Sequence, residues 1–222
     1  MNRFRLYILL ALTAVSSTVS GQFHSRLFPS GMLSSSLVND IAFDRNDFLW
    51  VATENGLNRY DGVRVEKYLH RKDEPGSIAH NYITHIHIDR KGRLWIGSHE
   101  GVQIYRSITN DFSQVAVFED GSALNWTAED FLELPNGDMW VCSDSLVSVR
   151  VRGEMLLAEK VSLSALRGIK FDRVYMDSHE TIWLTSRTSG CYVIDYPTWT
   201  IRHFEDPLLD KAIVAGICED GR

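Results

Sequence analysis

Disulfide chemistry is the first thing this sequence lacks. Its 222 residues contain three cysteines, Cys142, Cys191 and Cys218, at wide spacing and without a CxxC pair. An odd number of scattered cysteines does not make a disulfide framework, and without paired cysteines there is no thiolate metal or redox motif. The three are therefore expected to be small buried residues in strands.

Positive charge is also scarce. The chain has 23 Lys and Arg against 29 Asp and Glu, a formal net charge of −6, and no basic run. Without a basic patch there is no electrostatic footprint for nucleic acid, which excludes DNA and RNA as expected partners. Low-complexity tracts are absent too, and a hydrophobic share of 44% is enough for a sizeable core.

Long apolar segments are missing as well. The run Leu6–Leu12 is shorter than the roughly 20 residues of a membrane-spanning helix. It follows Arg3 and Arg5 and precedes small residues from Ser16 to Gly21, which is the three-part pattern of a secretory signal peptide. We therefore expect residues 1–21 to be a signal peptide; the alternative is an N-terminal membrane anchor.

A repeat is the strongest feature that the sequence does contain. Trp50, Trp95, Trp140 and Trp183 follow one another at intervals of 45, 45 and 43 residues. No stretch keeps a 3.6-residue rhythm through a repeat, which excludes a helical solenoid. We expect the four tryptophans to pack one repeat against the next.

Each repeat shows the pattern of four short strands. Alternating runs such as Val38–Phe43 and Ile83–Ile88 come first, then a polar turn, then the strand with the tryptophan, then two more strands. Four antiparallel strands in about 44 residues is the size of one β-propeller blade. The predicted fold is all-β: about 4.5 propeller blades in an incomplete ring, at about 37–70, 82–118, 126–161 and 169–204, with the start of a fifth at 212–222.

These repeats resemble the two-component regulator propeller repeat, whose pattern is an apolar strand, Asp, a Gly turn, Leu-Trp-Ile-Gly-Thr, then Gly-Leu and Tyr. The first repeat matches at Phe48–Thr53 and Asn55–Gly62, and the second at Gly92–Ser98 and Glu100–Val102. The third and fourth repeats match less well, and the third lacks the leading Asp and the loop Gly. The opening segment Gly31–Val38 also looks like the start of these sensors.

The resemblance implies a function. Such propellers form the periplasmic sensor region of Bacteroidetes hybrid two-component histidine kinases, whose parent protein is anchored in the inner membrane. They typically detect oligosaccharides and signal to polysaccharide-utilisation genes through a β-sandwich domain and a membrane helix. The resemblance therefore implies an oligosaccharide or other small periplasmic ligand, the remaining blades and the sandwich domain as partners, and room for a homodimer.

No kinase motif is present, so we expect this chain to be the first, non-enzymatic part of a longer sensor. Four and a half blades cannot close the usual seven-bladed ring, and a ring that is not closed leaves exposed strand edges. The segment from Phe23 to Phe28 looks like a strand that would complete the missing last blade.

Residues with catalytic or metal-binding chemistry are few. His85 and His87 would share one strand face and could ligate a metal, but no third ligand is indicated. Glu129 and Asp130 are a carboxylate pair, but neighbouring strand residues point to opposite faces, which disfavours glycosidase chemistry. No cofactor, metal site or catalytic residue is predicted.

A ligand site is expected in the loops of one propeller face, where the second and third strands join and where one blade connects to the next. Loops on a rigid scaffold usually carry recognition residues. Planar polar groups and an aromatic platform suit a sugar, which gives these candidates: Arg71, His80, Asn81, His99, Asn125, Trp126 and Arg187.

Two alternatives to a ligand-binding sensor remain. One is a secreted propeller enzyme, a lyase or glycosidase, which would need a carboxylate cluster. The other is a propeller used only as a protein-interaction platform.

Overall fold

The computed structural model describes residues 29, 31–116, 118–119, 122–123, 126–153, 155–206 and 214–220. The predicted signal peptide 1–21, the segment from Phe23 to Phe28 and Asn125 lie outside the described residues. Within them the chain is almost entirely β-structure, with one 3₁₀ turn at Ser164–Leu166. No helix in these residues is long and apolar enough to cross a membrane.

Four sheets of four antiparallel strands follow one another along the chain, each in simple sequence order. We call them blades 1 to 4. Blade 1 has β1 Val38–Phe43, β2 Leu49–Thr53, β3 Gly56–Tyr60 and β4 Val65–Tyr68; blade 2 has β5 Ile83–Ile88, β6 Leu94–Ser98, β7 Gly101–Arg106 and β8 Asp111–Val115; blade 3 has β11 Asp130–Glu133, β12 Met139–Cys142, β13 Val147–Arg152 and β14 Met155–Lys160; blade 4 has β15 Arg173–Met176, β16 Thr181–Ser186, β17 Gly190–Asp195 and β18 Thr200–Phe204.

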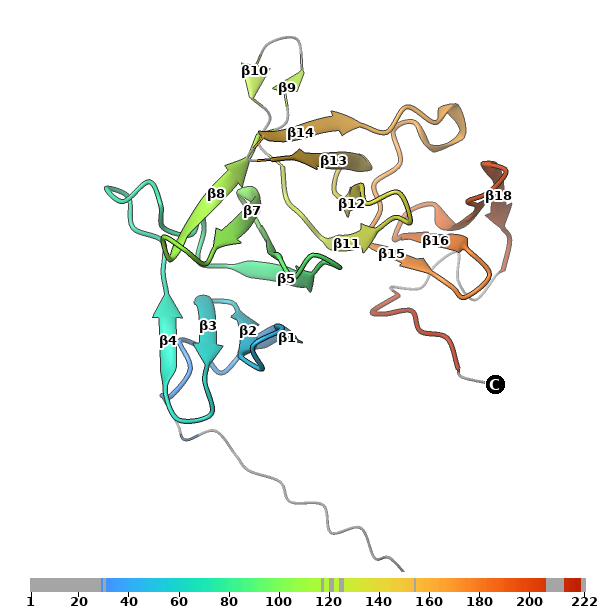
Figure 1. Cartoon of the computed structure of the whole chain (residues 1–222). Coiled ribbons are helices and arrows are strands. Elements are labelled where there is room, and N and C mark those ends of the chain that lie inside the picture. The colour runs from blue at the N-terminus through green and yellow to red at the C-terminus, as the bar shows by residue number, and fades with distance from the viewer. Residues whose placement is uncertain are drawn as a thin grey trace, which may run out of the picture.

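The blades form an open arc, with the first strand of each blade nearest the centre (Figure 1). Contacts join β1 to β5, β5 to β11 and β11 to β15. This confirms the predicted all-β propeller architecture without a closed ring. Because the strands alternate in direction, the turns between first and second strands lie on one side, which we call the turn face. The turns between second and third strands and the connections between blades lie on the other, the loop face.

An aspartate explains the turn before three of the four repeat tryptophans. In blade 2 the carboxylate of Asp89 accepts hydrogen bonds from the backbone N–H groups of Lys91 and Arg93 at 3.0 and 2.8 Å, and from the indole of Trp95 at 2.9 Å. Asp44 and Asp177 hold their tryptophans in the same way, each at 2.9 Å. One carboxylate therefore caps the turn and orients the indole that faces the next blade.

Blade 3 makes the same turn without the aspartate. Leu134 stands in its place, and the backbone bonds Leu134 N–H to Asp138 carbonyl and Gly137 N–H to Leu134 carbonyl close the turn at 2.8 and 2.9 Å. Gly137 has a φ of +88°, a conformation that glycine adopts without strain. The turn geometry is thus kept by the backbone, and the weaker sequence match of the third repeat does not alter the blade.

The core lies between the blades. Trp50 packs in one cluster with residues of β5 and β6, and Trp95 packs in a second cluster with residues of blade 3, including Phe131. Trp50, Trp95 and Trp140 are buried, as expected for residues that pack blade against blade. Trp183 is only half-buried, because no described blade lies beyond it.

The free side of blade 1 shows the same incompleteness. Ile41 and Ile86 occupy equivalent positions on β1 and β5, yet Ile41 is 58% exposed and Ile86 is 4% exposed. Ile86 is buried against blade 1, whereas no described blade precedes Ile41. Phe43, two residues along the same face of β1, is also exposed. The strand position that is buried in the later blades, at Ile86, Phe131 and Val174, is therefore uncovered in the first.

Polar bonds also join the innermost strands of neighbouring blades. The Asp40 carboxylate accepts the Ile86 N–H at 2.9 Å, and the Asp130 carboxylate accepts the Val174 N–H at 3.0 Å. The imidazole of His85 lies between these two carboxylates, with Nδ1 3.0 Å from Asp40 and Nε2 2.9 Å from Asp130. This histidine therefore links three consecutive blades.

Residues 214–220 continue the repeat contacts beyond blade 4. The Ser178 N–H donates to the Glu219 carboxylate at 2.9 Å, as the Arg90 N–H donates to Glu133 at 2.7 Å two blades earlier. The Arg173 guanidinium donates to the Ala215 carbonyl at 3.0 Å. Glu219 thus takes the position that Glu133 holds in blade 3, although no strand is formed here.

Two local expectations were wrong. Blade 2 was expected to run to about residue 118, but its fourth strand ends at Val115, and the chain then forms a separate two-stranded hairpin, β9 Phe118–Glu119 and β10 Ser122–Ala123. Cys142 and Cys191 are buried, but Cys218 is exposed and outside any strand. Burial in strands therefore holds for only two of the three cysteines.

Candidate ligand site between blades 1 and 2

The connection from β4 to β5 is a folded loop. Its backbone makes two turns, with the Glu74 N–H bonded to the Arg71 carbonyl at 3.0 Å and the Ser77 N–H to the Glu74 carbonyl at 2.9 Å. It is tied to blade 2 because the Phe112 N–H donates to the Gly76 carbonyl at 3.0 Å. The connection therefore presents its side chains from a fixed backbone, as recognition loops generally do.

A stack of aromatic rings lies where this connection reaches the loop face. The rings of Tyr82 and His99 are parallel within 13°, with centroids 4.3 Å apart, and His80 lies 5.4 Å from His99. His80 and Tyr82 come from the connection, whereas His99 comes from the β6–β7 turn. The structure therefore brings together His80 and His99, two of the residues singled out from the sequence.

The polar edges of this stack can hold hydroxyl groups. Nδ1 of His80 accepts the Tyr82 N–H at 2.9 Å, so the proton of the neutral ring is on Nε2, which can donate. The Tyr82 hydroxyl lies 3.5 Å from the carboxylate of Glu54, which is exposed on the β2–β3 turn. Donor and acceptor groups thus flank an aromatic surface, the arrangement that suits a sugar ring.

Asn81 supports the stack and does not face outward as a free side chain. Its carbonyl oxygen accepts the Gly56 N–H at 2.7 Å, and its side-chain oxygen accepts the His70 N–H at 2.7 Å. Asn81 therefore ties the connection to the β2–β3 turn of blade 1, and we assign it a positioning role.

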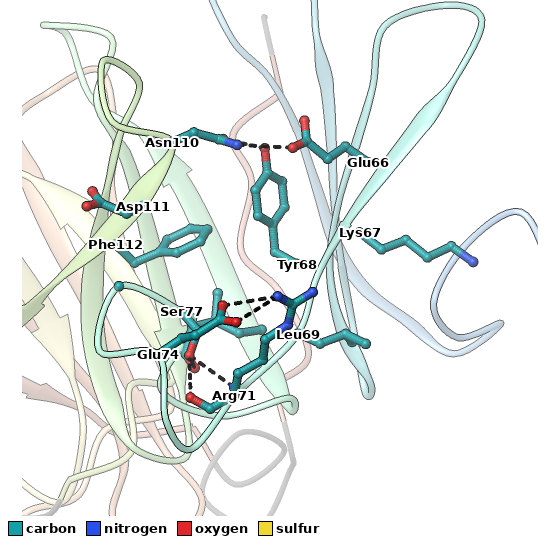
Figure 2. Close-up of a pocket in the computed structure, with 12 residues that line it drawn as sticks. Glu66, Lys67, Tyr68, Leu69, Arg71, Glu74, Ser77, Asn110, Asp111 and Phe112 are labelled. Carbon is teal, nitrogen blue, oxygen red and sulfur yellow. Dashed lines mark hydrogen bonds and ion pairs between the residues drawn. The ribbon is translucent and has the colours of Figure 1, made fainter.

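Arg71 lies farther out, at a groove on the outer rim between β4 and β8 (Figure 2). This rim groove has a volume of about 390 Å³. Glu66, Tyr68 and Asn110 form one end, where the Tyr68 hydroxyl and the Asn110 side-chain oxygen are 2.9 Å apart and the Asn110 amide donates to Glu66 at 3.1 Å. Arg71 lies at the other end, paired with Glu74 at 3.0 Å.

The charges at the rim groove are compensated. Arg59 pairs with Glu66 at 2.5 Å, and Arg106 pairs with Asp111 at 2.6 Å. Burial alone would raise the pKa of Glu66, but the hydrogen bonds from Asn110 and Arg59 lower it below the usual range, so the carboxylate stays ionised. Burial, together with the hydrogen bond to Tyr105, raises the pKa of Tyr68, which keeps its hydroxyl protonated.

Trp126 does not provide the expected aromatic platform. It is buried in the core between blades 2 and 3, and a Cβ added to Gly101 would lie 2.7 Å from its indole nitrogen. Because the ring is buried and packed this closely, it has no free face for a sugar, and Trp126 is not part of the site. Trp126 can pack inward because Gly101 of β7 has no side chain, and the sequence around Trp126 does not indicate this contact.

Arg187 is not part of the same cluster. It lies in the β16–β17 turn of blade 4 and pairs with Asp172 at 3.0 Å. Blade 3 separates it from the stack (Figure 1). Asn125 lies outside the described residues, so its place relative to the stack remains a prediction.

Tyr82 is the residue that sequence reasoning missed. It directly precedes β5, and an aromatic residue at the end of an inter-blade connection is the signal that could have identified it. Its stacking partner comes from a turn 17 residues later, so the contact itself is visible only in the fold.

The residues considered for metal or acid–base chemistry are engaged in structural contacts. The carboxylate of Asp130 accepts hydrogen bonds from the next blade and from His85, and Glu129 lies 3.7 Å from the Lys170 ammonium. Across the part of the chain that the structure describes, no group of three or more His, Cys, Asp or Glu side chains could hold a metal ion.

Two segments of the chain, residues 32–55 and 77–100, match the family model of the two component regulator propeller. These segments contain the first two tryptophans of the repeat and much of the connection that carries His80 and Tyr82. The resemblance to this repeat is therefore confirmed. No curated protein matches the sequence.

Solved structures share the fold. The extracellular domain of a protein named as the hybrid two component system BT3049 from B. thetaiotaomicron is 22% identical, with a TM-score of 0.71 over 84% of this chain and 27% of that one. A second such domain, of BT4673 from the same organism, is 20% identical, with a TM-score of 0.65 over 82% and 27%. PorZ, a surface component of the type-IX secretion system of Porphyromonas gingivalis, is 17% identical, with a TM-score of 0.64 over 86% and 31%.

The chain spans only about a quarter to a third of these structures. Two of them belong to two component systems and one to a secretion system, so the shared fold does not by itself assign a function.

Proposed function

We propose that this chain is part of the periplasmic ligand-sensing propeller of a hybrid two-component sensor, and that its ligand is an oligosaccharide. The Tyr82–His99 stack, flanked by His80 and Glu54 on the loop face, is the observation that carries the ligand proposal. A sugar ring could pack its C–H groups on an aromatic face of this stack and exchange hydroxyl hydrogen bonds with His80 Nε2 and the Glu54 carboxylate.

A binding role is supported over an enzymatic one by the state of the carboxylates. Asp130 is committed to His85 and to a backbone N–H, and Glu129 faces Lys170, so neither is poised to act as a general acid or base. The histidine kinase activity of the parent sensor would lie outside this chain.

We further propose that the chain is continued by more blades of the same ring. The exposed Ile41 and Phe43 on blade 1 and the half-buried Trp183 on blade 4 are the faces that neighbouring blades would cover. The contact of Ser178 with Glu219 supports this, because it repeats a blade-to-blade contact. Reading the gene beyond the codon for Arg222 tests it: an open frame with further tryptophan repeats is expected, and a stop codon would refute it.

The ligand site is tested with the full chain and a panel of neutral xylo-, arabino-, malto- and cello-oligosaccharides in calorimetric titrations. Tyr82→Ala and His99→Ala remove the stack and should weaken binding about tenfold, the combined worth of a stacking contact and a hydrogen bond. Tyr82→Phe keeps the stack and should lose less. His179→Ala, which removes an exposed histidine on the turn face, serves as the matched control and should bind as wild type does.

Two results would count against the proposal. If no oligosaccharide binds the wild-type chain, the ligand class is wrong. If an oligosaccharide binds and both stack variants keep full affinity, the class stands but the site is elsewhere.

A further inference from the structure

A hollow of about 630 Å³ lies on the turn face between blades 2 and 3. Two turns and the end of β13 border it, and it is open to solvent. Arg90 and Lys91 come from the turn before Trp95, Asn136 and Gly137 from the turn before Trp140, and Arg150 and Arg152 from β13. None of these residues belongs to the loop-face stack or to the rim groove.

The ion pairs in this hollow are oriented with their positive ends outward. Arg90 lies 3.2 Å from Glu133, and Arg150 lies 3.0 Å from Asp138. The two carboxylate side chains are only 10% and 16% exposed, whereas the two arginine side chains are 58% and 46% exposed. A molecule that approaches the hollow therefore meets the guanidinium groups first, although each has a carboxylate beneath it.

Two further cations border the hollow without a counter-charge. Lys91 and Arg152 are both exposed, and within the described residues neither forms an ion pair with a carboxylate. Arg90, Lys91, Arg150 and Arg152 stand against three carboxylates, Glu133, Asp138 and Glu159, so in a chain with a net charge of −6 this hollow carries a small local excess of positive charge. The electrostatic field of this positive excess raises the local concentration of anions.

The arginines of the hollow are held in place before any ligand arrives. The Arg90 guanidinium also donates to the carbonyl of Leu134, and its backbone N–H donates to Glu133. Arg150 is held by a second carboxylate, Glu159, at 3.0 Å. A guanidinium that is already ordered loses little side-chain entropy on binding, and its planar fork matches the oxygens of a carboxylate, sulfate or phosphate.

We infer that this hollow is a binding site for an oxyanion, the carboxylate, sulfate or phosphate group of a free ion or of an acidic saccharide. Arg90 and Arg150 would donate to the oxygens, while Lys91 and Arg152 would supply the net positive charge that the paired arginines lack. The site is independent of the proposed oligosaccharide stack, since it lies on the opposite face and uses other residues.

Titrations of the full chain with sodium sulfate, sodium glucuronate and glucose, at constant ionic strength, test the inference. Sulfate or glucuronate should bind and glucose should not. The double variant Lys91→Gln, Arg152→Gln should weaken anion binding at least about fivefold, since each exposed charge contact contributes modestly. The control Lys72→Gln, Arg167→Gln removes the same charge from exposed residues of the loop face and should bind as wild type does.

The two anions distinguish a general oxyanion site from a site for an acidic saccharide. Binding of both anions indicates an oxyanion site in general, and binding of glucuronate alone indicates an acidic saccharide. The inference is overturned if neither anion binds, or if the control loses as much affinity as the double variant. Each result is separate from the stack, because Tyr82→Ala leaves this hollow unchanged.

Discussion

His85 is expected to make the stability of this protein depend on pH. Its imidazole lies between Asp40 of blade 1 and Asp130 of blade 3, at 3.0 and 2.9 Å, and its side chain is only 28% exposed. Arg173 of β15 acts against these two carboxylates and lowers the pKa of His85, and His85 in turn lowers the pKa of His87 on its own strand. Burial would lower the pKa of His85, but the hydrogen bond and charge of Asp130 and the charge of Asp40 raise it above the usual value.

The direction of the pH effect follows from that shift. A folded-state pKa above the unfolded value of about 6.5 means that the protonated ring stabilises the fold. This contribution is complete below the unfolded pKa and is lost as the pH rises through the folded pKa. The free energy of unfolding should therefore fall on the alkaline side of pH 6.5, with a limiting slope of about 1.4 kcal/mol per pH unit for one proton.

His87 should act in the opposite direction. It lies two residues along the same strand, near the same Phe131 ring, but burial lowers its pKa because no carboxylate is within ion-pair distance among the described residues. The unfolded chain then binds the proton more readily, so His87 destabilises the fold as the pH falls below about 6.5. Two neighbouring histidines thus predict a stability maximum between their two effects.

The magnitude can be worked from the contacts. Each hydrogen bond to a charged group contributes about 1.5 to 3 kcal/mol, and partial exposure and desolvation reduce the sum. His85→Ala should therefore lower the free energy of unfolding by roughly 2 to 4 kcal/mol at pH 6, with less effect at pH 8.5. His85→Gln should flatten the alkaline limb, and His87→Gln should flatten the acidic limb.

Urea unfolding followed by tryptophan fluorescence at pH 5.5, 6.5, 7.5 and 8.5 measures both limbs. The reasoning is wrong if His85→Gln leaves the alkaline limb unchanged, or if both variants change the same limb. Loss of stability by the same amount at every pH would show that His85 contributes packing alone.

Two further predictions concern the turns. Asp89→Ala removes a buried carboxylate that holds Lys91, Arg93 and Trp95, and should lower the free energy of unfolding by about 3 kcal/mol in urea titrations; a loss below about 1 kcal/mol would contradict the role of this carboxylate. Gly101→Ala places a Cβ at a φ of +87° and 2.7 Å from the Trp126 indole, so it should lower the melting temperature and shift the tryptophan emission to the red. An unchanged emission spectrum would show that Trp126 is not packed there.

The blades could be predicted from the sequence because each carries its own pattern. The alternation in Val38–Phe43 and Ile83–Ile88 gave strands with these same ends, β1 and β5. The tryptophan period set the blade size, since Trp50, Trp95 and Trp140 each pack against the next blade. These patterns are local, because a few consecutive residues are enough to indicate a strand or a turn.

The candidate site was harder to predict because its contacts join different blades. The Tyr82 hydroxyl reaches Glu54 only when blades 1 and 2 are docked, and Trp126 turns inward only because Gly101 leaves room for it. No periodic sequence pattern indicates whether a side chain in a loop points outward or inward. The residue types and loop positions of His80 and His99 made them candidates, but the sequence could not predict that they lie close together.

The position of the stack at a seam between blades bears on how a ligand could act. A ligand shifts a conformational equilibrium only when it binds the two states unequally. His80 and Tyr82 belong to the connection, which Asn81 ties to blade 1 and Gly76 ties to blade 2, whereas His99 belongs to blade 2 alone. The Tyr82–His99 stack extends the β5–β6 pairing of blade 2, whereas Glu54 belongs to blade 1, so a change in the angle between these blades changes the spacing between Glu54 and the rings. A site built within one blade would lack this dependence, so the seam is where binding can be coupled to the relative position of blades.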